Sequence, residues 1–415
     1  MSLGRMDQAL RDRARRVIPS GLWGHMNAAG IGPSYPQFFT RGEGALLWDA
    51  DGRRYIDFMC GWGPIILGRR HPEVEAAVAR QHADGDLLNG PAPVLVDLAE
   101  VLTDVMPFAD WVMFQKNGTD ATTLAVTLAR AAAGRRKILV ARGAYHGAAP
   151  WCSPSKAGVS GEDRAHLLHF DYNDVSSLEA AAAEAGEDLA GVLVSAFKHD
   201  YGVDQALPTS TFAAAARRVC DQAHAALIVD DVRAGFRIDL RGSWAPLGVA
   251  PDLSAFSKAV ANGYALSFVA GAERYRAAAK AGQVYATGSF WCGADAMAAA
   301  LATVDVLRSG DALDHMGRMG ERLRAGLARL AATEGLSLRQ TGPAQMPLVL
   351  FEGDVDGAVG AAFCAAALEA GAYFHPRHNM FICAAHTPEL IDEALLAAAA
   401  GMAAAARVAQ TRVAS

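Results

Sequence analysis

The sequence predicts an α/β protein with a large, mainly parallel sheet and a smaller α+β part. Between about residues 72 and 301, short apolar runs alternate with longer segments of helical periodicity. Strand, helix and strand repeated in this order build a parallel sheet that is covered on both faces. The hydrophobic content of 52% and the charged content of 20% fit a folded chain with a large core.

The periodicity places each element in order. A helix is expected over residues 5–17, and two or three antiparallel strands with tight turns are expected over 38–58. The expected strands of the large sheet are 111–115, 137–141, 191–196, 226–230, 253–256 and 266–271. The expected helices around that sheet are 72–83, 93–105, 119–133, 174–185, 208–224 and 293–307. Beyond residue 308 we expect helices at 311–333, 355–370 and 388–408, and strands at 337–341 and 346–351.

The length of 415 residues favours two domains. We expect a large domain over residues 55–305. A small domain is expected to combine residues 1–54 with residues 306–415.

Composition excludes several classes of protein. The net charge of −6 gives no reason to expect a nucleic-acid partner. The first residues lack an apolar signal segment, and the Ala-rich run 395–406 is too short to span a bilayer. The six cysteines form no Cys-x-x-Cys pair, which argues against a zinc site or a disulfide framework. We therefore predict a cytoplasmic protein without a metal or a membrane partner.

Lys258 is the first candidate for chemistry. It follows the expected strand 253–256, and Asp230 ends the expected strand 226–230. Lysine is rare in this Arg-rich chain, and unlike Arg it can lose its proton and form a Schiff base. Alone, such a lysine is more often a solvated strand end. A Lys that forms a Schiff base and an Asp that keeps a pyridine nitrogen protonated together suit pyridoxal phosphate (PLP).

Two further segments suit the same cofactor. Gly118 and Thr119 stand between a strand and a long helix, where free N–H groups can bind a phosphate. An ordinary capped helix is the alternative. Tyr145 follows the expected strand 137–141 and can stack on a flat ring, or simply pack within its loop. Because side chains alternate along a strand, only one of Asp230 and Asp231 is expected to face the ring.

Together these motifs resemble the class III aminotransferases of the fold-type I PLP-dependent transferases, most closely the glutamate-1-semialdehyde 2,1-aminomutase branch. The similar blocks occur in the family's order along nearly the whole chain. They are WDADGRRYID (48–57), WGPIILG (62–68), NGTDA (117–121), YHG (145–147), DDVRAGFR (230–237), FSK (256–258) and AHT (385–387).

The resemblance implies roles for individual residues. Lys258 would be the Schiff-base lysine and proton shuttle, Asp230 would pair with the pyridine nitrogen, and Tyr145 would stack on the ring. Gly118 and Thr119 would bind the phosphate. Ser289, with Thr287 as the fallback, would reach the phosphate of a neighbouring subunit, which implies a homodimer with shared active sites. Trp62 would line the substrate entrance.

The chain also departs from the aminomutases. Asn27 stands where they carry the Arg that holds the substrate carboxylate, and the segment 147–171 is shorter than their gating loop. The family's Glu-Pro is replaced by the stretch 195–200. In the altered block 374–381, Arg377 is our candidate for a substrate carboxylate and His378 is a further candidate substrate contact.

The sequence thus predicts an aminotransferase that moves an amino group between a small amino donor and a keto acceptor. An aminomutase or racemase with the same first steps is the alternative. A relative that only binds the cofactor is the second alternative, although both Lys258 and Asp230 are present. A nucleotide-dependent oxidoreductase is disfavoured because no G-x-G-x-x-G follows an early strand.

Overall fold

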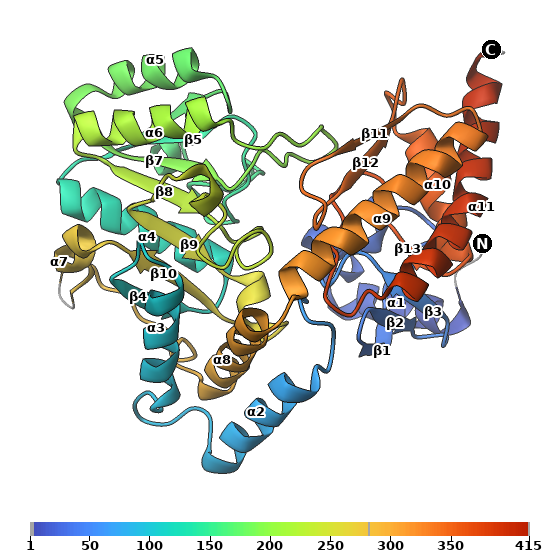
Figure 1. Ribbon diagram of the computed structural model, residues 1–415, viewed down its shortest axis with the longest axis horizontal. Helices are drawn as coiled ribbons and strands as arrows, with labels where there is room; N and C mark the ends of the chain where they lie inside the picture. Colours follow the sequence, from blue (N-terminus) through green and yellow to red (C-terminus); the bar gives the residue numbers. More distant parts are fainter. Residues whose placement is uncertain (1–3, 281–282, 414–415) are drawn as a thin grey trace. The chain divides into compact units, whose positions relative to one another are not determined.

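The computed structural model describes residues 4–280 and 283–413 (Figure 1). The chain divides into two compact units. The large unit comprises Pro72–Asp200 and Gln205–Leu313. The small unit comprises Met1–His71, Tyr201–Asp204 and Asp314–Ser415.

A seven-stranded sheet forms the centre of the large unit. Its strand order is β4 (Trp111–Gln115), β10 (Ser267–Gly271), β9 (Leu253–Phe256), β8 (Ala226–Asp230), β7 (Leu189–Ser195), β5 (Lys137–Ala141) and β6 (Leu167–Phe170). Only β10 runs antiparallel to its neighbours in this sheet, so the predicted, mainly parallel sheet is confirmed. The edge strand β6 was not predicted, because it is short and mostly half-buried and carries a weak apolar signal.

Helices cover both faces of this sheet. On one face α4 (Gly118–Ala133) packs in a core that includes Leu193 and Ile228. On the other face α5 (Val175–Ala185) and α6 (Ser210–Ala223) pack in a core that includes Leu227 and Val229. Neighbouring residues of β8 therefore point to opposite faces, as alternation along a strand requires. The remaining helices of the large unit are α2 (Pro72–Asp84), α3 (Val94–Val105), α7 (Arg276–Ala279) and α8 (Ala294–Ser309).

The small unit is an α+β structure. A four-stranded sheet has the order β1 (Phe39–Glu43), β2 (Leu46–Asp49), β3 (Arg54–Asp57) and β13 (Ala372–Tyr373). A second sheet pairs β11 (Leu338–Thr341) with β12 (Leu348–Phe351). The helices are α1 (Arg5–Val17), α9 (Ala312–Thr333), α10 (Ala358–Glu369) and α11 (Pro388–Val413), and α9 begins at the boundary with the large unit. In the described part of the chain, no helix is long and apolar enough to cross a bilayer.

The boundary between the units differs from the expected one at residue 55. That position lies inside β3, which pairs with β2 and, in parallel, with β13 from the far end of the chain. These pairings hold the strand in the small unit, and the large unit begins only at Pro72. The short stretch Tyr201–Asp204 also belongs to the small unit, where the Gly202 N–H donates to the Arg377 carbonyl at 2.8 Å.

Candidate active site

A buried contact between a carboxylate and an imidazole lies at the carboxyl end of β8. The Asp230 side chain is almost fully buried, and its Oδ2 lies 2.7 Å from Nδ1 of His146. Its Oδ1 accepts the Val232 N–H at 3.1 Å. A carboxylate oxygen has two lone pairs, so this carboxylate can still accept a hydrogen bond from a protonated ring nitrogen. Asp231 instead accepts the Ser243 N–H through Oδ2 at 2.8 Å, so the two neighbouring carboxylates have separate surroundings.

Lys258 begins the short 3₁₀ turn Lys258–Ala261 directly after β9. Its φ of 50° lies in the left-handed region, which a residue with a side chain adopts only at a cost of about 1–3 kcal/mol. Burial lowers the pKa of its amine to about 7, and the positive charges of Arg233 and Arg237 lower it further against the opposing charge of Asp230. A large share of the amine is therefore neutral at neutral pH, as a nucleophile that attacks an aldehyde must be.

The N-terminus of α4 offers a place for a phosphate. Asn117 caps the helix, and its side chain accepts the Asp120 N–H at 3.1 Å. The Asn117 carbonyl accepts the next N–H, that of Ala121, at 3.2 Å. The N–H groups of Gly118 and Thr119 are the first of the helix, and such groups have no carbonyl partner within the helix. An anion placed at this helix start would meet these N–H groups and the positive end of the helix dipole.

The backbone around this helix start is closely packed. A Cβ added to Gly118 would lie 2.7 Å from Cγ1 of Val232, in the turn that follows Asp230. A Cβ added to Gly147, whose φ is +126°, would lie 2.5 Å from Oγ1 of Thr119. The same Thr119 oxygen accepts the Ala148 N–H at 3.2 Å. Glycine at these two positions therefore lets the start of α4, the 145–148 loop and the end of β8 converge.

Tyr145 immediately precedes His146, whose ring contacts Asp230. Its side chain is 48% exposed. Burial raises the pKa of its phenol, and the charges of Cys152, Arg233 and Asp230 also act on it. Four segments thus meet at one end of the large sheet. They carry the residues that the sequence predicted for the cofactor: Gly118, Thr119, Tyr145, Asp230 and Lys258.

Sequence reasoning missed three side chains of this cluster. His146 stood within the YHG motif without a role, although its ring contacts Asp230. Arg233 acts electrostatically on Lys258, Asp230 and Tyr145, and burial lowers its own pKa to about 10. His199 lies in the stretch that replaces the family's Glu-Pro, and burial together with Arg233 holds its pKa well below the usual range. All three lie in loops, where hydrophobic periodicity gives no signal, and the motifs YHG and DDVRAGFR assigned no role to His146 or Arg233.

Thr287 and Ser289 lie in the loop between α7 and α8. Both side chains are exposed, and Tyr285 and Phe290 beside them are 89% and 62% exposed. Within residues 4–280 and 283–413, no hydrogen bond joins Thr287 or Ser289 to Thr119, Asp230 or Lys258. Their predicted role on a neighbouring subunit therefore remains a prediction.

The predicted substrate residues lie in the small unit. Trp62 packs edge-on against the rings of His25, His378 and His375, with centroid distances of 4.8, 5.0 and 5.4 Å. Its φ of 68° is left-handed, within a run of positive φ values from Cys60 to Gly63. We call Trp62, His25, His375 and His378 the Trp62 cluster.

Two other predicted substrate residues make local contacts. The Asn27 side chain accepts the Ala29 N–H at 3.0 Å and donates to the Leu22 carbonyl at 2.8 Å, so it stabilises its own turn. The exposed Arg377 donates from Nη2 to the Asp356 carbonyl at 2.5 Å. The geometry thus gives Arg377 a structural contact, and its role toward a carboxylate stays a prediction.

Comparison with known proteins decides the family. The family model of the class III aminotransferases matches residues 29–405. The chain belongs to the class III aminotransferases. An aminopentol aminotransferase of Sphingopyxis macrogoltabida is 47% identical over 395 residues, which cover 95% of this chain and 93% of that protein. The structure of a Sphingopyxis sp. MTA144 FumI protein in its PLP internal aldimine form matches with a TM-score of 0.97 at 46% identity, covering 98% of each chain.

Other class III relatives are less similar. A 3-aminobutyryl-CoA aminotransferase of Cloacimonas acidaminovorans is 32% identical over 386 residues, which cover 92% of each protein. A glutamate-1-semialdehyde 2,1-aminomutase of Neisseria gonorrhoeae is 31% identical over 428 residues, which cover 94% of this chain and 97% of that protein. The predicted aminotransferase activity is confirmed and favoured over the aminomutase alternative. This chain, as a class III aminotransferase, uses PLP, so the predicted cofactor is also confirmed.

The residues at this end of the large sheet fit PLP. Asp230 offers a buried acceptor for a ring nitrogen, Lys258 a partly neutral amine, and the start of α4 a pair of N–H donors. When bound, PLP supplies the electron sink that stabilises a carbanion next to the transferred nitrogen.

Proposed function

We propose that Lys258 and Asp230 carry the chemistry of the amino transfer. Lys258 would hold the cofactor and, with the donor amine bound, would move a proton at the substrate carbon. Asp230 holds the ring nitrogen protonated and is itself oriented by His146 at 2.7 Å. Tyr145 covers the ring, and Gly118 and Thr119 bind the phosphate. The observation that carries this proposal is the buried Asp230, 2.7 Å from His146 at the end of β8, with Lys258 at the end of the neighbouring strand β9, where burial also lowers the pKa of its amine.

We further propose that the amino donor is a hydroxylated amine without a carboxylate. The similarity to an aminopentol aminotransferase, a name that denotes an amine with several hydroxyl groups, supports this class of donor. The amide of Asn27, where the aminomutases have an Arg, is engaged in its own turn. An uncharged donor needs no guanidinium there.

The Trp62 cluster suits hydroxyl groups. Nδ1 of His375 accepts the N–H groups of Arg377 and His378 at 3.1 and 2.9 Å. Burial lowers the pKa of His375 to about 4, so the ring is neutral at neutral pH and carries its proton on Nε2. Nδ1 of His378 lies 2.6 Å from the Asn379 carbonyl, to which it donates. His375 therefore offers a neutral ring N–H donor next to the indole ring of Trp62.

The amino acceptor is proposed to be a keto acid, whose carboxylate needs a cation. Arg377 is the candidate from the sequence. Arg233 is the candidate from the structure, because its charge acts on Lys258, Asp230 and Tyr145. Measuring the two half-reactions separately distinguishes an arginine that binds the keto acid from residues that bind the amino donor.

A homodimer with shared active sites is also proposed. Ser289, with Thr287 as the fallback, would reach the partner's phosphate. The exposed rings of Tyr285 and Phe290 on the same loop support a surface that a second copy covers. The cytoplasm is the proposed compartment, because all six cysteines are free and several are buried as thiols.

A half-reaction screen tests the donor class. The holoenzyme is mixed with amino alcohols, plain alkylamines, and α-, β- and ω-amino acids, and the cofactor absorbance is followed. We expect amino alcohols to convert the cofactor fastest. Faster conversion by α-amino acids would overturn the proposed donor and leave the aminotransferase chemistry intact.

The second half-reaction tests the acceptor site. In Arg233→Gln the second half-reaction, in which a keto acid takes up the amino group, should slow by roughly 10- to 100-fold. A lost charged hydrogen bond of about 1.5–3 kcal/mol has an effect of this size. The donor half-reaction should change much less when it is measured at a pH above the raised pKa of Lys258 in this variant. Arg377→Gln is compared directly, and Arg407→Gln on the exposed side of α11 is the control. If only the Arg377 variant slows the second half-reaction, Arg377 and not Arg233 binds the carboxylate of the keto acid.

A further inference from the structure

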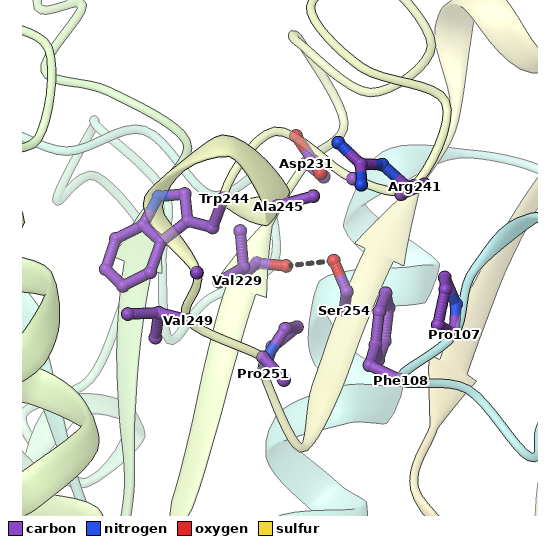
Figure 2. A pocket seen from close by; sticks show the side chains of 13 residues that line it. Pro107, Phe108, Val229, Asp231, Arg241, Trp244, Ala245, Val249, Pro251 and Ser254 are labelled. Carbon is purple, nitrogen blue, oxygen red and sulfur yellow. Dashed lines mark hydrogen bonds between the residues drawn. The ribbon is translucent and has the colours of Figure 1, made fainter.

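A cavity of about 170 Å³ beside the end of β8, in the large unit, is lined mainly by apolar side chains (Figure 2). The Ser254 hydroxyl at this cavity donates to the Val229 carbonyl at 3.0 Å, the bond drawn in Figure 2. Asp231 accepts the Ser243 N–H at 2.8 Å, and the Ser243 hydroxyl also acts on this carboxyl. These polar groups are therefore engaged with one another. Reactive side chains outside the amino-transfer site lie instead in the small unit.

Cys60, Cys383 and His386 form a buried cluster within the small unit. The ligand atoms of the three side chains all lie within 4.8 Å of one another. All three residues are 0% exposed, and both cysteines are free thiols. His386 belongs to the AHT block (385–387), to which the amino transfer assigns no role. The fold thus joins two thiols and an imidazole from opposite ends of the chain.

Backbone hydrogen bonds hold the two cysteine segments side by side. The Phe381 N–H donates to the Phe58 carbonyl at 2.8 Å, and the Ala384 N–H donates to the Ile66 carbonyl at 2.7 Å. Cys60 Sγ lies 3.5 Å from the Phe381 carbonyl oxygen. A disulfide bond is about 2.05 Å long, so the two sulfur atoms need to approach by less than about 3 Å to form one.

The contacts of Cys383 favour its thiolate, which is the nucleophilic form of cysteine. The hydrogen bond from the Cys60 thiol, more than the charge of His386, lowers the pKa of Cys383 below its ordinary value against the opposing effect of burial. Nδ1 of His386 lies 3.3 Å from Cys383 Sγ and accepts the Cys383 N–H at 3.0 Å. Because that nitrogen lone pair is already shared, the cluster suits thiol chemistry better than a metal ion.

We propose that Cys60 and Cys383 form a redox modification site, at which hydrogen peroxide joins the two sulfurs in a reversible disulfide. The Cys383 thiolate attacks one peroxide oxygen and breaks the O–O bond, which gives a sulfenic acid and a hydroxide that takes up the proton lost by the thiol. The Cys60 thiol then displaces the sulfenic oxygen as a second water, and the S–S bond forms. The two thiols together lose two electrons and two protons, and the peroxide gains them as it becomes two waters.

Burial decides which oxidants can act here. Only a small, uncharged oxidant can reach sulfur atoms that have no exposed surface, and hydrogen peroxide is both. Disulfides that form in a reducing compartment are usually transient and redox-sensing. The proposed bond is therefore a temporary modification that thiols reverse.

The disulfide is expected to act on the Trp62 cluster. Cys60, with a φ of 48°, begins the run of positive φ values that carries Trp62 and ends at Gly63. Few backbone conformations are open to residues in this region, so a displacement of Cys60 is passed on to Trp62. This link rests on the proposed role of Trp62 in binding the donor. Oxidation should then slow the donor half-reaction, and dithiothreitol should restore it.

Peptide mapping of the wild-type holoenzyme tests the disulfide itself. The enzyme is treated with hydrogen peroxide, the remaining thiols are blocked with iodoacetamide in denaturant, and the chain is digested without reductant. We expect a peptide pair cross-linked through Cys60 and Cys383, which dithiothreitol separates. The exposed Cys292 reports that the oxidant has acted. Oxidised Cys292 with both buried sulfurs still free, or Cys383 found only as sulfinic acid, would overturn the proposal.

Cysteine variants locate the effect on the reaction. Cys60→Ser and Cys383→Ser cannot form the bond, so only the wild type should show a loss in the donor half-reaction that dithiothreitol reverses. Cys364→Ser removes another buried thiol of the same unit and should respond to peroxide as the wild type does. If a variant fails to fold, the mapping of the wild type still decides whether the disulfide forms. A cross-link without a reversible loss, or the same reversible loss in Cys60→Ser, would overturn the link to Trp62 and leave the amino-transfer chemistry untouched.

Discussion

His146 Nδ1 lies 2.7 Å from Asp230 Oδ2, in a pair that is buried on both sides. The Thr122 hydroxyl donates to the His146 carbonyl at 2.7 Å, which ties this loop to α4 and so to the proposed phosphate site. His146 thus contacts Asp230 through its imidazole and the first turns of α4 through its backbone carbonyl, so it links the two groups proposed to hold the ring nitrogen and the phosphate. Asp230 is oriented for the cofactor through a residue that the sequence did not single out.

Loss of the imidazole should weaken cofactor binding. We expect His146→Gln to lower PLP affinity by roughly 10- to 100-fold, because a hydrogen bond to a charged group contributes about 1.5–3 kcal/mol. Asp230→Ala should cost more, about 3–5 kcal/mol, because it leaves a buried cation without its partner. Absorbance titration of the apoenzyme with PLP measures both. His82→Gln on the exposed face of α2 is the control, and an equal loss there would point to general instability.

The amine of Lys258 should titrate near neutral pH. Its pKa is lowered to about 7 by burial and by the charge of Arg233. Removing that charge in Arg233→Gln favours the ammonium form, so the pKa should rise. The rate at which the apoenzyme takes up PLP, measured against pH and trapped with borohydride, should then have its midpoint at higher pH than in the wild type. Peptide mapping must place the trapped cofactor on Lys258, and a label on another lysine would refute the assignment.

Asp231 should make the fold less stable above pH 6. Burial raises its pKa to about 6 from the ordinary value of 3.8. The folded protein therefore binds this proton more tightly than the unfolded chain, so the fold loses stability as the pH rises from about 4 to about 6, and the full penalty is present above pH 6. Asp231→Asn cannot ionise, and it should raise the free energy of unfolding at pH 8 by up to about 3 kcal/mol.

Chemical denaturation of the wild type and Asp231→Asn at pH 8 and pH 4 checks this difference. The gain at pH 8 should shrink to near zero at pH 4. A variant that loses the same stability at both pH values would show that the carboxylate makes stabilising contacts. Amino transfer should remain close to that of the wild type, because Asp231 is bound to Ser243 and not to the His146 pair.

Mixed subunits test the shared active site. Lys258→Ala cannot perform the chemistry, and Ser289→Ala should bind PLP weakly through its partner's site. If each site takes Lys258 from one subunit and Ser289 from the other, a heterodimer of these variants carries one site with both defects and one intact site. Mixing two nearly inactive proteins should therefore restore activity, up to about a quarter of the wild-type value if half of the dimers are mixed. Sedimentation must show a dimer, and a fully active monomer would contradict the proposal.

The elements of the large unit could be read from the sequence because their signals are local. Strands such as β5 and β9, and helices such as α4, begin or end within two residues of the expected positions. Alternation along β8 also indicated that Asp230 and Asp231 have different surroundings. Lys258 and Asp230 were found because each follows a buried strand whose position the apolar pattern sets.

Long-range contacts were decided only by the tertiary structure. β13 is two residues long, and it pairs with β3 from more than 300 positions away, so no local pattern reveals the pairing. Cysteine spacing indicated no metal site, yet buried Cys60, Cys383 and His386 place their ligand atoms within 4.8 Å of one another. In that cluster Nδ1 of His386 already accepts the Cys383 N–H at 3.0 Å.

The sequence by itself determined the type of fold, the cofactor and the residues that follow the sheet strands, because hydrophobic periodicity and strand ends are properties of short segments. The tertiary structure alone decided which loops meet those residues. His146 reaches Asp230 from 84 positions away, and Arg233 acts on Lys258 from another loop. The chemistry of a titratable group depends on its burial and on the charges around it, and both are set by the path of the whole chain.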